Sequence, residues 1–83
     1  MKLTNLMSEL VKRNGSDLHL TGDGYPFFRI QGQILPASSE QYSSKELRAD
    51  LTQILVNEKL AKFDKEKELD CSFGLDGIAS FRL

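Results

Sequence analysis

The sequence predicts an α+β fold, in which a largely antiparallel sheet of about five strands is covered on one face by two or three helices. The predicted order of elements is α-β-β-β-α-α-β-β. Three observations lead to this prediction: two segments carry apolar residues at helical spacing, several short segments alternate apolar and polar residues, and turn-forming pairs separate the alternating segments. With 83 residues, the chain has room for one small domain.

The first segment, residues 3–13, is predicted to form an amphipathic helix. One stripe holds its apolar residues, which recur at i, i+3, i+4, i+7 and i+8: Leu3, Leu6, Met7, Leu10 and Val11. We expect this stripe to pack on the rest of the domain. Gly15 follows the helix and is expected to end it in the left-handed conformation.

Residues 16–20 are predicted to form the first strand, because apolar and polar residues alternate there with a period of two. Leu18 and Leu20 fall on one face of this strand, whereas Asp17 and His19 fall on the other. The polar, glycine-rich residues 21–26 are typical of a loop.

Residues 27–30 and 33–35 are predicted to form the second and third strands. Gln31-Gly32 supplies a two-residue hairpin turn between them, since glycine adopts a positive φ without strain. Pro36 is expected to end the pairing, because proline has no amide hydrogen to donate to the sheet.

A capping box at Ser43 indicates the start of the second helix. We expect the Ser43 hydroxyl to accept a hydrogen bond from the Glu46 amide, and the Glu46 carboxylate to reach back to the backbone of Ser43. Four apolar residues mark the buried side of this helix: Leu47, Leu51, Ile54 and Leu55. Asn57 is expected to break it, and residues 58–66 to form a short third helix held by Leu60 and Phe63.

The last two strands are predicted at residues 69–75 and 78–83, joined by a two-residue turn at Asp76-Gly77. Cys71 lies among the apolar positions of the first of these strands and is expected to act as a small core residue. Because the final strand runs to residue 83 with no tail behind it, we expect the natural polypeptide to be longer.

Composition excludes several classes of protein. Eleven Lys and Arg against twelve Asp and Glu give a net charge of −1, which is unlike the strongly basic surface of a general nucleic-acid binder. No apolar run approaches the ~20 residues of a membrane helix. One cysteine cannot form an internal disulfide, which is typical of a cytosolic protein.

The sequence lacks the common motifs of self-sufficient enzymes and metal sites. None of the six glycines precedes a lysine, so the chain holds no P-loop. One Cys and one His cannot supply the usual zinc ligands. Ser16, Asp17 and His19 cannot form a catalytic triad, because side chains of one strand alternate between its two faces. His19 is expected to lie on an exposed or interface face and to hydrogen-bond locally.

Arg29 and Arg82 are each the only cation of an otherwise apolar predicted strand. Two interpretations stay open from the residues alone. In one, each arginine forms a surface ion pair with a carboxylate such as Asp17 or Asp70, which contributes ~0 to 1 kcal/mol. In the other, the guanidinium groups hold an anion at the edge of the domain, since arginine presents a planar fork to phosphate oxygens.

Four short motifs resemble, in the same order, the N-terminal domain of the type II/IV secretion ATPases. They are SDLHL, FRIQG, LDCSF and FRL at residues 16–20, 28–32, 69–73 and 81–83. The family pattern is ser-asp-leu/ile-his, arg-val-asp-gly, asp-phe-ser-phe and phe-arg-val. Within the superfamily, the chain is most similar to the type IV pilus retraction ATPases, which drive twitching motility.

The resemblance implies that residues 1–83 form one PAS-like domain in front of a RecA-like motor domain that lies beyond this chain. It implies a cytoplasmic homohexamer in which the domain packs on its own motor domain and on neighbouring subunits, with the pilus platform of the inner membrane as a further partner. ATP and Mg²⁺ are then the parent protein's cofactors. This chain alone is expected to hold no cofactor and to catalyse no reaction.

By the same resemblance, Arg82 matches the arginine of phe-arg-val and is expected near the nucleotide of the parent hexamer, with Arg29 as a second candidate. Ser16, Asp17, His19 and Asp70 match motifs expected to be structural or to lie at an interface. The sequence departs from the family pattern in three places: Gln31 replaces Asp, Cys71 replaces Phe, and Ser80 stands where relatives often carry another Arg.

An alternative function is a self-contained PAS-like module that binds a small ligand or a protein. It requires a pocket under the sheet, for which Phe27, Phe28 and Phe73 are the candidate lining residues. The corresponding domain of a type II or type IV secretion ATPase is also compatible with the motifs. An independent enzyme has no residue constellation to support it.

Overall fold

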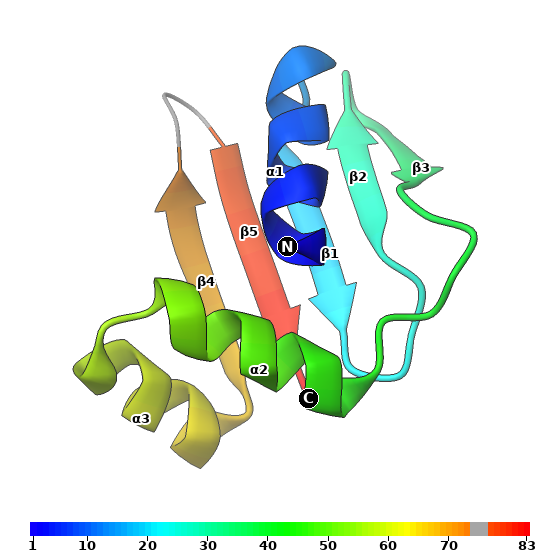
Figure 1. The fold of residues 1–83 in the computed structure, drawn as a ribbon. Coiled ribbons are helices and arrows are strands. Elements are labelled where there is room, and N and C mark those ends of the chain that lie inside the picture. Colours follow the sequence, from blue (N-terminus) through cyan, green and yellow to red (C-terminus); the bar gives the residue numbers. More distant parts are fainter. Residues whose placement is uncertain (74–76) are drawn as a thin grey trace.

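The computed structural model describes residues 1–73 and 77–83 (Figure 1). The eight elements follow the predicted order: α1 (Lys2–Lys12), β1 (Asp17–Thr21), β2 (Phe27–Ile30), β3 (Gln33–Pro36), α2 (Ser44–Ile54), α3 (Asn57–Glu66), β4 (Glu68–Phe73) and β5 (Gly77–Arg82). Gly74, Leu75 and Asp76 lie outside the described residues, so part of the predicted fourth strand and of the Asp76-Gly77 turn is not tested there. Gly77 itself is the first residue of β5.

The five strands form one open, mixed sheet in the order β3-β2-β1-β5-β4. Three neighbouring pairs of strands are antiparallel, and β1 with β5 is the parallel pair. The chain leaves β3, crosses through α2 and α3, and returns along β4 to place β5 beside β1. A parallel neighbour requires such a long connection. The prediction of a largely antiparallel α+β sheet is therefore confirmed.

All three helices lie on the same face of the sheet, as Figure 1 shows. Strand residues on this covered face alternate with those on the opposite, uncovered face, and they form the core together with one side of each helix. The buried apolar residues are Leu3, Leu6, Leu10, Leu18, Leu20, Phe28, Tyr42, Leu47, Leu51, Phe63, Leu69, Ala79 and Phe81. Burial of this apolar surface is the main stabilising contribution to the fold.

The apolar stripe of α1 is narrower in the structure than the sequence predicts. Leu3, Leu6 and Leu10 are buried, whereas Val11 is 58% exposed and Met7 is half-buried. Each residue turns the helix by about 100°, so Val11 lies at the edge of the stripe once Leu10 points into the core. The expectation that the whole stripe is buried was therefore wrong at Val11.

The end of α1 also differs from the prediction. Asn14, with φ of 56°, adopts the left-handed conformation instead of Gly15. Gly15 is required for a different reason. A β-carbon at this position would collide with the side chain of Leu10 and would lie 3.2 Å from the carbonyl oxygen of Arg29. The glycine thus lets the chain leave α1 close to the helix and to β2.

The turn between β2 and β3 has the predicted geometry. Gln31 and Gly32 have φ values of 50° and 78°, and Ile30 pairs directly with Gln33. Two consecutive positive φ values define the type I′ hairpin, whose twist matches that of the flanking strands. Pro36 is the last residue of β3, as expected.

The capping box of α2 is half formed. The amide of Glu46 donates to the Ser43 hydroxyl at 3.1 Å, as predicted. Instead of reaching back to the backbone of Ser43, the Glu46 carboxylate accepts a hydrogen bond from the Lys2 ammonium at 3.2 Å. This contact joins α1 to α2, so the predicted reciprocal bond is replaced by a link between helices.

The break between α2 and α3 falls earlier than the sequence predicts. Leu55 and Val56 have extended backbone conformations, and Asn57 is already the first residue of α3. Asn57 therefore starts the third helix and does not break the second one. The extended Leu55-Val56 segment carries apolar side chains at the corner between the two helices.

Candidate functional site

The uncovered face of the sheet holds the six residues for which the resemblance implies a nucleotide-proximal, structural or interface role. Alternation along β1 places Asp17 and His19 on this face, because Leu18 and Leu20 point into the core. In the adjacent strands the same alternation adds Arg29, Asp70 and Arg82, and Ser16 lies directly before β1. We call this the open face and define it by these six residues and their cross-strand neighbours.

Ser16, Asp17 and Arg29 form one cluster at the start of β1. Arg29 stands opposite Asp17 in the β1–β2 register, and its Nε lies 3.9 Å from Asp17 Oδ2. The Ser16 hydroxyl donates to the same carboxylate oxygen at 2.6 Å. The predicted ion pair between Arg29 and Asp17 is therefore present, and the serine orients the carboxylate within it.

Arg82 lies on β5 and pairs with a different carboxylate from the one predicted. It stands opposite Glu68 in the β4–β5 register, and its Nη2 lies 3.6 Å from Glu68 Oε2. The Arg82 side chain is 70% exposed, so water screens this pair and it contributes little to stability. The expected partner Asp70 stands opposite Ser80 instead.

His19 and Arg82 border a shallow hollow on the open face, with a volume of about 160 Å³. Its polar lining also includes Thr21, Glu68, Asp70 and Ser80. His19 stands between Phe27 of β2 and Ser80 of β5 on this face and is half-buried. Because the hollow holds two carboxylates and one arginine, its charge does not favour phosphate in this chain alone.

The structure does not bring Arg29 and Arg82 together. Arg29 is level with Asp17 at one end of β1, whereas Arg82 is level with Thr21 at the other end. With about 3.3 Å per residue and about 4.8 Å between strands, the two arginines are roughly 13 Å apart along β1 and about 10 Å apart across the sheet. They cannot bind the same phosphate group.

The open face also carries exposed apolar side chains. Phe27 is 41% exposed, and Ile34 and Ile78 are exposed as well. They lie beside the charged groups, since Ile34 pairs with Arg29 and Ile78 with Asp17. Apolar side chains surrounded by polar ones are typical of protein–protein contact surfaces.

The ligand pocket proposed from three phenylalanines is not formed. Phe27 lies on the open face, whereas Phe28 is fully buried on the covered face. Consecutive strand residues point to opposite sides of a sheet, so these two rings cannot line one pocket. The side chain of Phe73 lies outside the described part of the structure.

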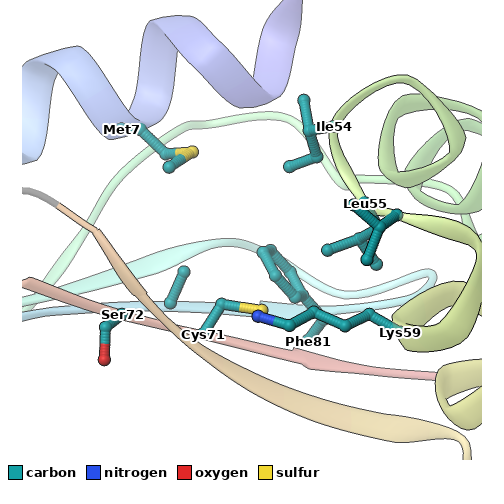
Figure 2. Close-up of a pocket in the computed structure, with 9 residues that line it drawn as sticks. Met7, Ile54, Leu55, Lys59, Cys71, Ser72 and Phe81 are labelled. Atoms are coloured by element: carbon teal, nitrogen blue, oxygen red, sulfur yellow. The ribbon is translucent and has the colours of Figure 1, made fainter.

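A second hollow, which the sequence did not predict, lies on the covered face between α1, the α2–α3 corner and β4–β5 (Figure 2). Cys71 lines it and is half-buried against the core, as expected of a small core residue. Burial raises the pKa of the Cys71 thiol, and the nearby Lys59 ammonium opposes this shift. Lys59 belongs to a run of alternating charges that is typical of a solvated helix face, so no sequence signal pointed to this hollow.

Within residues 1–73 and 77–83, no three His, Cys, Asp or Glu side chains are grouped so that they could hold a metal ion. In the same part of the chain, no helix has both the length and the apolar character that crossing a membrane requires.

Comparison with known proteins supports the resemblance that the motifs indicate. The chain is 29% identical over its whole length to the type IV pilus retraction ATPase PilT of Pseudomonas aeruginosa, and 23% identical to the type IV pilus ATPase PilU of the same organism. It spans about a quarter of the length of these curated relatives, 24% and 22% respectively. No protein-family model matches the sequence. The predicted resemblance to an N-terminal domain of a type IV pilus ATPase is confirmed.

Proposed function

We propose that this chain is the N-terminal, PAS-like domain of a cytoplasmic, hexameric ATPase that powers type IV pilus retraction and twitching motility. In this proposal a RecA-like motor domain follows residue 83 and binds ATP and Mg²⁺. The domain described here supplies a contact surface between subunits and contains no catalytic residue. Its further partner is the pilus platform at the inner membrane.

One observation carries the proposal. The six residues that define the open face come from four strands and from Ser16 directly before β1, and no helix of the described residues covers this face. Together with the exposed Phe27, Ile34 and Ile78, they form a surface with apolar and charged parts. Such a surface suits the packing of a motor domain from the same or a neighbouring subunit.

Arg82 is the better candidate for an arginine near the nucleotide. Its guanidinium is mostly exposed, and its contact with Glu68 is long and screened by water. A phosphate could therefore replace the glutamate at little cost. Arg29 is less exposed than Arg82, at 48%, and its partner Asp17 is 23% exposed and accepts a hydrogen bond from Ser16, so a structural role within the domain suits Arg29 better.

The test uses the full-length parent protein with three single variants: Arg82→Ala, Glu68→Ala and Arg48→Ala. Arg48 is the matched control, because it lies on α2 on the other side of the sheet and pairs with Asp64 there. The measurements are ATPase activity and the mass of the assembly in solution.

If Arg82 faces the nucleotide, Arg82→Ala lowers the ATPase rate, whereas Glu68→Ala and Arg48→Ala leave it close to wild type. If Arg82 acts only through its ion pair, Arg82→Ala and Glu68→Ala have equal effects. An Arg82→Ala protein with unchanged activity and unchanged assembly would refute the role proposed for this arginine.

A further inference from the structure

The hollow on the covered face lies where the helices leave part of the sheet uncovered. In Figure 1, α2 crosses over one end of β4 and β5, α3 lies beside β4, and α1 lies over β1, so that no helix of the described residues lies above the other end of β4–β5. The resulting cavity has a volume of about 290 Å³. This volume is at the small end of the range for ligand sites, so the cavity suits a short molecule.

The walls of this cavity are apolar. The buried residues Phe81 and Ala79 of β5 line it, and Met7 and Leu55 border it from α1 and from the α2–α3 corner (Figure 2). Val56 also lines the cavity and is 63% exposed, although it is a large apolar residue. Core atoms that line an empty space lose attractive contacts, so an apolar occupant of the cavity would be stabilised.

The described lining of the cavity carries a positive charge. Among its described lining residues, Lys59 is the one charged side chain. Its ammonium group reaches over the cavity toward the sulfur of Cys71, whereas the Ser72 hydroxyl points away from the cavity (Figure 2). No carboxylate of residues 1–73 or 77–83 forms an ion pair with Lys59. A cation beside an apolar wall favours an anion as its partner.

We propose that this cavity binds a small apolar molecule with a single carboxylate, whose apolar part contacts Met7, Leu55 and Phe81 and whose carboxylate binds the Lys59 ammonium. The site is independent of the open face, because it lies on the other side of the sheet from Arg82. The shared chemistry, an alkyl chain beside an anionic group, can come from a free fatty acid or from an anionic phospholipid at a membrane surface.

The experiment titrates the 83-residue chain with three probes that differ only in the end group: octanoate, 1-octanol and octylammonium. Binding is followed by NMR shifts of the Met7, Leu55 and Ala79 methyl groups. Slower alkylation of Cys71 by N-ethylmaleimide is a second readout, because an occupant would cover the thiol. Vesicles of phosphatidylglycerol serve as a fourth probe, to distinguish a lipid surface from a free carboxylate.

The expected order of affinity is octanoate, then octanol, then octylammonium. Lys59→Gln should lower the affinity for octanoate by about three- to fivefold, which is the size of a partly exposed ion pair, and leave octanol binding unchanged. Lys62→Gln is the matched control, because Lys62 lies on the same helix but lines a different hollow. Cys71→Leu should fill the cavity and abolish binding of all three short probes, and thermal unfolding checks that this variant remains folded.

Two results would overturn the proposal. In one, octanoate and octanol bind equally well and Lys59→Gln changes neither, which would make the cavity apolar without selection for an anion. In the other, none of the probes shifts the three methyl groups or protects Cys71. Neither result bears on Arg82, so failure here is distinguishable from failure of the pilus ATPase proposal.

Discussion

The buried contact between Tyr42 and Asp50 is expected to make the fold sensitive to alkaline pH. Tyr42 precedes the Ser43 cap, is 1% exposed, and donates its hydroxyl hydrogen to a carboxylate oxygen of Asp50 on α2. Burial, followed by the hydrogen bond and charge of Asp50, raises the pKa of Tyr42 above its ordinary value of 10.0. Tyr42→Phe removes the hydroxyl and retains the ring.

Two effects of Tyr42→Phe can be worked out separately. At neutral pH the variant leaves the buried Asp50 carboxylate without this donor, which should lower the free energy of unfolding by about 1.5–3 kcal/mol. Above pH 10 the unfolded wild type loses the tyrosine proton, whereas the folded state keeps it. Wild-type stability therefore falls with rising pH, by up to ~1.4 kcal/mol per pH unit from this one group.

The assay is urea unfolding followed by far-ultraviolet circular dichroism at pH 7 and pH 11, since the chain contains no tryptophan to report by fluorescence. The difference in stability between wild type and Tyr42→Phe should shrink by about 1.4 kcal/mol between these pH values. Lysine titration acts on both proteins and cancels in this difference. Tyr25→Phe is the matched control, because the other tyrosine of the chain is exposed.

The reasoning fails if the difference in the free energy of unfolding between wild type and Tyr42→Phe is the same at pH 7 and pH 11. It also fails if Tyr25→Phe lowers stability as much as Tyr42→Phe, because burial would then not be the cause.

Two further predictions concern the helices and use the same unfolding measurement at pH 7. Leu10→Ala should lower the free energy of unfolding by about 2–5 kcal/mol, because Leu10 is fully buried. Its neighbour Val11 is also part of the predicted stripe but is mostly exposed, so the free energy of unfolding of Val11→Ala should stay within about 0.5 kcal/mol of the wild-type value. Equal losses of stability in Leu10→Ala and Val11→Ala would contradict the orientation of α1 in the structure. Ser43→Ala should cost about 1 kcal/mol through loss of the α2 cap, and an unchanged midpoint would show that the cap is dispensable.

The composition of the open face was predictable because a strand has a period of two. Once Leu18 and Leu20 are assigned to the core, Asp17 and His19 must point the other way, whatever the rest of the fold. The pairing partners of the charged residues do not follow from this pattern. The predicted Gln31-Gly32 turn sets the register of β2 with β3, in which Arg29 is opposite Ile34, whereas Asp17 and Arg29 meet between β1 and β2, which residues 22–26 connect.

The partner of Arg82 could not be predicted in this way. A two-residue turn at Asp76-Gly77 would pair residues 75 and 78, and would place Arg82 opposite Cys71, next to Asp70. The structure pairs Phe73 with Gly77, and this register places Arg82 opposite Glu68. Residues directly opposite one another share a face of the sheet, so the register expected from the turn would have set Cys71, a predicted core residue, against Arg82. The turn and the alternation thus favoured different registers, and the structure follows the alternation.

The cavity could not be predicted either, because it depends on where helices end relative to strands. Leu55 and Val56 are apolar and follow α2, so the sequence favours their inclusion in one continuous helical stripe. In the structure they form the extended corner between α2 and α3. The helix layer stops there, and the sheet beyond it stays uncovered.

The charges of the open face bear on how the proposed ATPase role could operate. Asp17, Glu68 and Asp70 outnumber Arg29 and Arg82 on this face, and both arginines are within 4 Å of a carboxylate. An isolated domain of this kind repels phosphate more than it attracts it. A role near the nucleotide therefore requires a neighbouring subunit to bring additional cations or to displace Glu68 from Arg82. For this reason the effect of Arg82 is expected in the assembled parent protein, and comparison with Glu68→Ala separates an anion-binding arginine from one that only pairs across the sheet.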